Sequence, residues 1–313
     1  MISVKAAALA AAALSMAGGT TAASATTAAA GPASVRPAAI AFDITTVYAL
    51  APDHSYVAQY DGTPGDWTTI GGPARNVYAG GAGVFATNPT TGDIFQYNGT
   101  PGSWTQVGGP GSEFAEGGGH LYGVGPSDNY VAEYNGTPGS WTVIESGPIG
   151  TVYAGLYGVF AENGTNSDVL KYNGTPGSWT NIGFGPVSNA AVGANGFYAA
   201  DFGGLDFSQW TSGGGWAQIG PVKPNDIADP IVAGAPGLVI GDQEIPGYYK
   251  YNGTPFSWTE ISFVGNSFPV AMNYDHLYGT TFSTPSSATV YSGTGMQWTN
   301  IGGPANAYLI AGD

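Results

Sequence analysis

Tyr97-Asn98-Gly99-Thr100-Pro101-Gly102-Ser103-Trp104-Thr105 is the stretch that decides the fold, because copies of it return along the whole chain. Close copies run over 60–68, 134–142 and 172–180, and looser copies over 210–217, 251–259 and 291–299. The tryptophans that close the copies are 37 to 42 residues apart, namely Trp67, Trp104, Trp141, Trp179, Trp216, Trp258 and Trp298. A period of this length is typical of one supersecondary unit copied seven times, with each copy packed on its neighbours.

One unit, residues 74–109, shows how the repeat is built. Short runs of β-favouring residues cover 76–79, 83–87, 93–97 and 104–107, and Gly, Pro or Asn separates each run from the next. This pattern predicts a four-stranded antiparallel meander. Four strands in roughly 40 residues are the repeat of a propeller blade. We therefore predict an all-β, seven-bladed β-propeller with four-stranded antiparallel blades.

The two ends of the repeat region complement each other. Residues 45–70 contain the second, third and fourth strands of a unit, whereas residues 305–312 supply a first strand and no more. We expect the C-terminal strand to pair with the three N-terminal strands and so close the ring. Closure would remove exposed sheet edges, which otherwise invite aggregation.

Two strand positions predict how the blades pack. The first strand ends in small residues in most units, as expected where neighbouring strands crowd around a central channel. The second strand carries an aromatic ring in six units, namely Tyr48, Phe85, Tyr122, Phe160, Tyr198 and Tyr278. We interpret these rings as packing between adjacent blades.

The N-terminal region predicts export. Lys5 precedes an Ala/Leu-rich stretch, and Ala23-Ser24-Ala25 is a small-x-small cleavage site, so residues 1–25 are expected to be a signal peptide. Residues 26–42, rich in Ala, Thr and Pro, are expected to be a disordered lead-in. The propeller would then cover residues 43–313 of a secreted protein, which without cysteine has no disulfides.

The net charge of the chain argues against some classes of binding partner. The chain holds 21 acidic residues against 6 Lys and Arg, and its formal net charge is −15. This balance argues against nucleic acid, whose phosphates call for clustered cations, and against docking on an anionic membrane. Abundant Gly, Tyr and Trp instead suit tight turns and neutral polar ligands.

Catalytic and metal-binding groups are sparse in the sequence. The three histidines, His54, His120 and His276, form no metal-ligand pair, and we assign them neither metal nor catalytic role. Carboxylates recur in or near the loops between second and third strands, at Asp93, Asp128, Asp168, Asp206 and Asp242. Such loops could assemble a calcium site or an acid pair on one face, although Asp is also a common turn residue. We expect no cofactor.

The repeated phrase itself supplies the candidate ligand site. In the fourth strand the indole shares a face with the residue two places on, and an indole beside amides offers a sugar a stacking platform and hydrogen bonds. The expected glycan contacts are Trp67, Trp104, Trp141, Trp179, Gln106, Asn181, Asn98, Asn135 and Asn173. A purely structural interpretation competes with this one, since Asn-Gly and Pro-Gly form turns and Thr and Trp form strands.

The order of the repeat resembles a known group of proteins. An aromatic third strand, a Gly-rich turn, Trp-Thr-x-Ile-Gly-Gly and a Val-Tyr-Ala-Gly-like strand look like the tectonin and tachylectin-like propellers over residues 45–312. The resemblance implies a lectin of innate recognition or cell-surface binding. The fifth and sixth units depart from the pattern, through 210–215 without Pro and an insertion within 219–233, so of the seven blades we least expect a site in these two.

Together these observations predict a secreted, monomeric, non-catalytic carbohydrate-binding protein with repeated weak glycan sites. Several weak sites on one rigid ring can raise avidity by roughly 10² to 10⁴. Two alternatives stay open. One is an exported propeller enzyme, a lyase or glycoside hydrolase, that works from the loop face of Asp93, Asp168, Asp201 and Asp242. The other is a scaffold that docks proteins or the cell envelope through an acidic rim.

Overall fold

The computed structural model describes residues 47–201, 207–220, 227–242, 247–263, 267–273, 275–281, 287–304 and 308–311. The expected signal peptide (1–25) and lead-in (26–42) lie outside the described residues, as does Asp206. Every regular element in the described part is a strand. No helix there is long and apolar enough to cross a membrane.

Twenty-eight strands of the described chain form seven four-stranded sheets, which we number as blades from the N-terminus. Blade one contains β1 (Val47–Leu50), β2 (Val57–Tyr60), β3 (Trp67–Gly71) and β28 (Tyr308–Ala311). Blade two contains β4 (Val77–Gly80), β5 (Gly83–Thr87), β6 (Asp93–Tyr97) and β7 (Trp104–Pro110). Blade three contains β8 (Glu113–Gly117), β9 (His120–Val124), β10 (Tyr130–Tyr134) and β11 (Trp141–Ser146).

The remaining blades repeat the same order. Blade four contains β12 (Ile149–Gly155), β13 (Gly158–Asn163), β14 (Val169–Tyr172) and β15 (Trp179–Gly183). Blade five contains β16 (Val187–Val192), β17 (Phe197–Asp201), β18 (Phe207–Thr211) and β19 (Gly215–Gln218). Blade six contains β20 (Ile227–Gly234), β21 (Gly237–Asp242), β22 (Gly247–Tyr251) and β23 (Trp258–Phe263). Blade seven contains β24 (Ser267–Met272), β25 (Leu277–Thr281), β26 (Ala288–Tyr291) and β27 (Trp298–Gly302).

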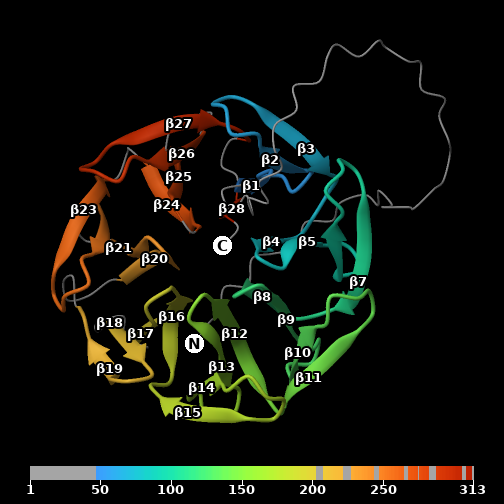
Figure 1. The fold of residues 1–313 in the computed structure, drawn as a ribbon, viewed down its shortest axis with the longest axis vertical. Coiled ribbons are helices and arrows are strands. Elements are labelled where there is room, and N and C mark those ends of the chain that lie inside the picture. The colour runs from blue at the N-terminus through green and yellow to red at the C-terminus, as the bar shows by residue number, and fades with distance from the viewer. Residues whose placement is uncertain are drawn as a thin grey trace, which may run out of the picture. The chain divides into compact units, whose positions relative to one another are not determined.

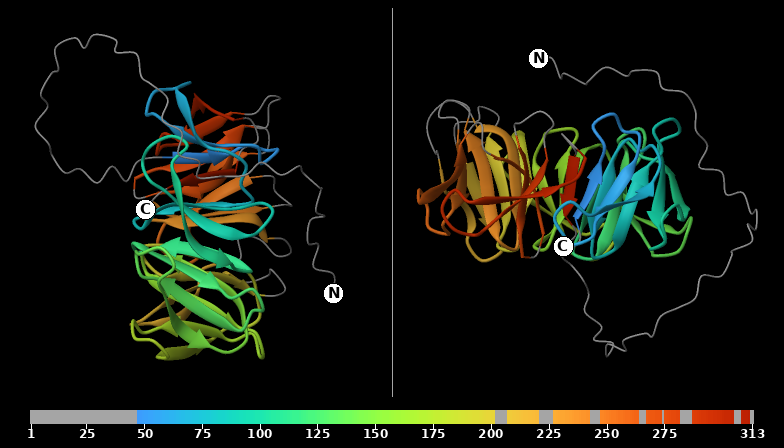
Figure 2. Two further views of the ribbon diagram at one scale, coloured as in Figure 1. Left: turned by 90° about the vertical axis from the view of Figure 1, so that its right-hand side faces the viewer. Right: turned by 90° about the horizontal axis from the view of Figure 1, so that it is seen from above.

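The seven sheets stand in a ring, with the first strand of each blade innermost and the fourth outermost (Figure 1). Seen from the side, the strands run across the thickness of the ring (Figure 2). All pairings between the described strands are antiparallel, for example β4 with β5 and β5 with β6. The expected fold class, a seven-bladed propeller of four-stranded antiparallel blades, is confirmed.

Blade one is built from both ends of the repeat region. Its strand order is β28-β1-β2-β3, and β28 pairs antiparallel with β1. The register places Val47 opposite Ala311 and Leu50 opposite Tyr308. The hydrogen-bonded sheet therefore joins the last described strand of the chain to the first three.

The hydrophobic core is divided among the junctions between blades. At the junction of blades two and three, Phe85 and Ile94 pack with Leu121 and Tyr134, and all four are almost fully buried. The second-strand rings thus pack between adjacent blades, as expected from the sequence. Near the axis the first strands crowd: a Cβ on Gly117 would overlap the backbone of Gly155 in the next blade.

The repeated phrase forms the hairpin between the third and fourth strands. Tyr97 pairs with Trp104 across this hairpin, and their ring centroids lie 5.2 Å apart. The backbone N–H of Asn98 donates to the carbonyl of Ser103 at 3.0 Å and closes the turn. Gly102 has a φ of +79°, a conformation that side chains with a Cβ rarely adopt. The local sequence thus determines the turn, and the turn places Trp104 at the start of β7, the outermost strand of the blade.

Candidate functional site

The indole N–H of every repeat tryptophan donates to a main-chain carbonyl of the preceding blade, at 2.6 to 3.1 Å. The pairs are Trp67 with Ile301, Trp104 with Ile70, Trp141 with Val107, Trp179 with Ile144, Trp216 with Ile182, Trp258 with Ile219 and Trp298 with Ile261. The same carbonyls also accept a backbone N–H from the turn in several blades, as Ile70 does from Gly102 at 2.8 Å. Each tryptophan therefore joins two blades.

In six of the seven blades a β-bulge makes these carbonyls available, whereas Ile219 of blade five lies just after the end of β19. In blade one the register passes from Val57 opposite Gly71 to Ala58 opposite Thr69, so Ile70 has no partner across the ladder. The extra residue of a bulge leaves the regular pairing, and its carbonyl is free to bond elsewhere. The Ile70 side chain is buried in the core while its carbonyl serves the next blade.

The polar candidates from the sequence also bond within their own blades. Asn98 donates to the hydroxyls of Ser103 and Thr105, and Asn135 and Asn173 each bond the equivalent serine and threonine. Gln106 donates to the carbonyl of Gly108 at 3.3 Å, and Asn181 donates to a carboxylate oxygen of Asp168 at 2.8 Å. The nine candidates lie on four different blades and do not line one common cavity.

Trp141 has a second environment. It lines an apolar groove of about 440 Å³ together with Phe114, Tyr130 and Val143. The Val143 side chain is 48 % exposed at the edge of this groove. Among the sequence candidates for glycan contact, Trp141 thus has a described cavity beside it, although that cavity is poor in hydrogen-bonding groups.

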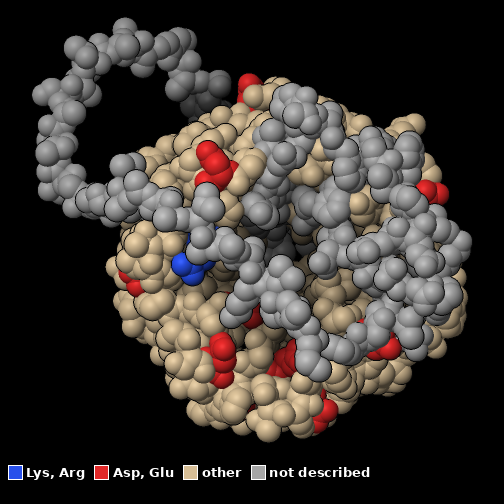
Figure 3. Space-filling model, turned by 180° about the vertical axis from the view of Figure 1, so that it is seen from behind, with Lys and Arg blue, Asp and Glu red and all other residues tan. Residues whose placement is uncertain are grey.

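Histidines and carboxylates form no metal-binding group of three in the described part of the chain. His54 lies 3.0 Å from the carbonyl of Ala74 through Nδ1, and His120 is 2.7 Å from Glu133. Asp93 accepts a hydrogen bond from Thr91, and Asp168 from Asn181, so these two carboxylates are held in separate blades. Acidic side chains are dispersed over the face seen in Figure 3.

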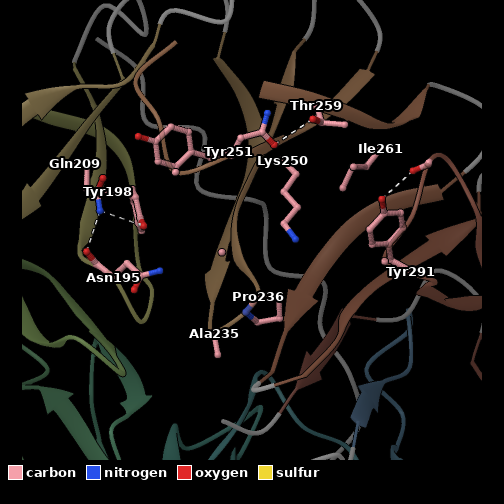
Figure 4. Close-up of a pocket in the computed structure, with 15 residues that line it drawn as sticks. Asn195, Tyr198, Gln209, Ala235, Pro236, Lys250, Tyr251, Thr259, Ile261 and Tyr291 are labelled. Carbon is pink, nitrogen blue, oxygen red and sulfur yellow. Dashed lines mark hydrogen bonds between the residues drawn. The ribbon is translucent and has the colours of Figure 1, made fainter. Parts of the chain in front are cut away.

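A polar cavity of about 640 Å³ lies around the end of blade six. It is bounded by the turn between β20 and β21 and by the hairpins that follow β22 and β26. The lining residues are Asn195, Tyr198, Gln209, Ala235, Pro236, Gly237, Lys250, Tyr251, Asn252, Gly253, Thr259, Ile261, Tyr291, Gly293 and Gly295. The volume is within the usual range for small-molecule sites. Rings of three blades face this space (Figure 4).

Hydrogen bonds fix one side of the cavity. Gln209 donates through Nε2 to the carbonyl of Asn195 at 2.8 Å and to the Tyr198 hydroxyl at 3.4 Å. Burial raises the pKa of Tyr198 to about 12, and the nearby Tyr251 adds to the effect. Burial also raises the pKa of Tyr251. Both phenols therefore stay protonated at neutral pH and can donate hydrogen bonds.

The opposite side carries Tyr291, whose hydroxyl donates to the carbonyl of Gly295 at 2.8 Å. Thr259 donates to Asn252 at 3.1 Å. Lys250 points from β22 into the middle of the space (Figure 4). The Lys250 ammonium is the one charged group among the described residues that line the cavity. No Asp or Glu is among these residues.

A related cavity of about 380 Å³ lies between blades three and four. Tyr122, Glu133 and Tyr172 occupy the repeat positions that Tyr198, Gln209 and Tyr251 occupy in the larger cavity. The residue that precedes the third-strand aromatic therefore differs between the two cavities, and the polarity and charge at the junction differ with it. Along the chain this position reads Gln59, Gln96, Glu133, Lys171, Gln209, Lys250 and Val290.

The cavity lies mainly in blades five and six, where the sequence pattern led us least to expect a site, and blade seven completes it. That expectation rested on the missing Pro in 210–215 and on the insertion within 219–233, and the candidates named from the sequence did not include Tyr198, Gln209, Lys250 or Tyr251. The signal was the variation at the third-strand position, next to a nearly constant turn.

Glu113, on the first strand of blade three, is the carboxyl with the clearest shift. Burial raises its pKa to about 7, the nearby Asp128 adds to the increase, and a hydrogen bond from the Val152 amide opposes it. Oε2 accepts that amide at 3.2 Å and links two neighbouring first strands. This bond gives Glu113 a structural role.

No family model and no curated protein matches the chain. Solved structures do resemble it. A catalytically inactive variant of virginiamycin B lyase from Staphylococcus aureus, with quinupristin, has a TM-score of 0.56 and 14 % identity over 80 % of this chain and 97 % of that one. YCF48 from Cyanidioschyzon merolae has a TM-score of 0.50 and 12 % identity over 75 % and 87 %.

TolB from Acinetobacter baumannii has a TM-score of 0.49 and 11 % identity over 86 % of this chain and 67 % of that one. The fold, together with the resemblance to the lyase variant and to YCF48, defines the chain as a seven-bladed β-propeller. Identities this low concern the fold alone.

Proposed function

We propose that this protein is an exported, non-catalytic binding protein for saccharides, and that the 640 Å³ cavity around blade six holds the sugar. The observation that carries the proposal is the lining. Of the three tyrosines that line it, Tyr291 is partly exposed and Tyr198 and Tyr251 are largely buried, and the polar residues Asn195, Gln209 and Asn252 also line the cavity. Rings with a few convergent polar groups suit a polyhydroxylated ligand.

The outer-strand tryptophans are the second candidate location. Their indole N–H groups already bond to carbonyls of the preceding blade, and the Asn side chains already bond to turn hydroxyls. A sugar there would have to rely on whatever ring surface the blade junction leaves exposed. We therefore give the cavity preference over the repeated phrase.

Chemical catalysis receives less support from the cavity. A glycoside hydrolase needs two carboxyl groups on either side of the scissile bond, and the described lining residues contain none. Binding without turnover fits this set of side chains best.

The test is isothermal titration of the purified protein against a panel of neutral, amino and acidic oligosaccharides. The matched pair is Gln209→Ala and Gln96→Ala, because both glutamines occupy the same strand position and both donate to a carbonyl of the first turn. Of the two, Gln209 lines the cavity. We expect Gln209→Ala to weaken binding roughly 3- to 10-fold, the value of one hydrogen bond, with Gln96→Ala unchanged. No binding to any saccharide would refute the proposal.

A further inference from the structure

We propose that the saccharide bound at blade six is acidic, and that Lys250 binds its carboxylate or sulfate group. This inference rests on the proposed function and adds the class of ligand. Lys250 lies on β22 with its side chain half-buried and pointing into the cavity (Figure 4). Among the described lining residues, the Lys250 ammonium carries the positive charge of the site.

The Lys250 ammonium has no hydrogen bond or ion pair with any described residue. Its cross-strand neighbours on the same face of the sheet are Val239 and Thr259, and both are uncharged. Glu260 pairs with Tyr249 and therefore points to the other face of the sheet. The described residues of the cavity wall thus supply no counter-charge.

Two other described cations differ from Lys250 in this respect. Arg75 donates to the carbonyl of Pro89 at 3.1 Å, and Lys171 donates to the carbonyl of Tyr172 at 3.2 Å. Lys171 occupies the same repeat position as Lys250, one residue before the third-strand aromatic. A lysine at this repeat position can therefore have a hydrogen-bond partner, as Lys171 does.

An ammonium partly removed from water loses hydration that only hydrogen bonds or an anion can replace. The chain has 21 acidic residues, yet none of them is among the described residues that line the cavity. A bound anion would supply the missing partner. The Tyr251 hydroxyl, also without a hydrogen bond to any described residue, adds a neutral donor to the same wall.

We expect the ligand to carry a single acidic group. The formal net charge of −15 repels a dense polyanion, so a strongly sulfated chain would be disfavoured at long range. A saccharide with one acidic group near Lys250 and neutral hydroxyls near Asn195 and Gln209 matches the middle and one side of the cavity.

The experiment compares each acid with its own ester. Trisaccharides of galacturonate, glucuronate and mannuronate, and one monosulfated trisaccharide, are titrated as free acids beside methyl esters or the unsulfated form, which keep the sugar and remove the charge. We expect at least one acid to bind roughly 10- to 100-fold tighter than its neutral form, as for a hydrogen bond to a charged group. Lys250→Met should remove that preference, Lys250→Arg should keep most of it, and Lys171→Met, at the equivalent position, should leave it unchanged.

The possible failures are distinguishable. Equal binding of every acid and its neutral form, or a preference that survives Lys250→Met, overturns the acidic-ligand inference and leaves saccharide binding intact. Binding of neutral saccharides alone would likewise overturn the acidic-ligand inference and leave the proposed saccharide binding intact. If no saccharide of any kind binds, the proposed function fails as well.

Discussion

Trp104 in blade two donates its indole N–H to the carbonyl of Ile70 in blade one at 2.9 Å. Ile70 is the bulged residue of its strand, so the hydrogen bond uses a carbonyl that the sheet leaves unpaired. The same bond recurs at all seven junctions. The indole hydrogen bond thus joins the blades into a ring, and at six of the junctions its acceptor is the carbonyl of a bulged residue.

Trp104→Phe should destabilise the propeller. The substitution removes the N–H donor and part of a ring that packs on Tyr97, while Gly102 still bonds the Ile70 carbonyl. We expect a loss of about 1 to 3 kcal/mol in the free energy of unfolding, measured by urea denaturation. Saccharide affinity should not change, because Trp104 does not line the cavity. Unchanged stability would show that the indole bond contributes little.

Phe256→Gly should stabilise the protein. Phe256 has a φ of +63° and is 59 % exposed, in the turn position where the close copies have glycine. A left-handed residue with a Cβ costs roughly 1 to 2 kcal/mol, part of which the greater freedom of unfolded glycine offsets. We expect a gain of up to about 1 kcal/mol in the free energy of unfolding.

The reciprocal change is Gly102→Ala at the equivalent turn, where an added Cβ would meet no other atom within 4 Å. Any effect there comes from backbone conformation alone, so this variant should lose about 1 kcal/mol. Melting curves of both variants test the pair, and a stabilised Gly102→Ala would contradict the explanation.

Glu113 should make stability depend on pH. Burial raises its pKa from 4.5 to about 7, so the folded protein keeps a proton that the unfolded chain releases between these values. The stabilisation by the protonated form is complete below pH 4.5 and is lost as the pH rises to about 7, by up to about 3 kcal/mol. Glu113→Gln keeps an acceptor for the Val152 amide and removes the titration. Urea denaturation from about pH 4 to 8 should therefore show a shallower decline for the variant, and parallel profiles would refute this.

Deletion of residues 303–313 should disrupt the ring. It removes β28, which pairs with β1 and completes the sheet of blade one. Since each blade is stabilised mainly by its neighbours, the truncated protein should lose cooperative unfolding and aggregate through the open edge of β1. Size-exclusion chromatography and calorimetry measure both effects. The control deletion of 26–42 should leave the melting curve nearly unchanged, and a monomeric 303–313 deletion with a normal curve would contradict the prediction.

The fold could be predicted because each unit repeats its own local signals. Gly102 and Asn98 mark the turn, Trp104 marks the next strand, and seven copies leave little choice of architecture. The role of Trp104 was harder to predict, since the carbonyl it binds becomes available only through a bulge at Ile70. A bulge depends on the pairing of two strands, and the alternation within one strand does not reveal it.

The cavity could not be predicted for a related reason. Its walls come from three blades, and Tyr198, Lys250 and Tyr291 lie far apart along the chain. Their proximity is a property of the closed ring. The departure of units five and six from the repeat was visible in the sequence as a missing Pro and an insertion, but it gave no sign of the space around Ala235 and Pro236.

The central claim is that a saccharide binds in the blade-six cavity and not on the outer strands. The most direct measurement is the dissociation constant of the best-binding saccharide, by isothermal titration, for Tyr251→Phe and Gln209→Ala beside Trp104→Phe and Trp179→Phe. We predict that the two cavity variants bind roughly 3- to 10-fold more weakly and that the two tryptophan variants bind as the wild type does. Loss of binding in the tryptophan variants, with full affinity in the cavity variants, would contradict this claim.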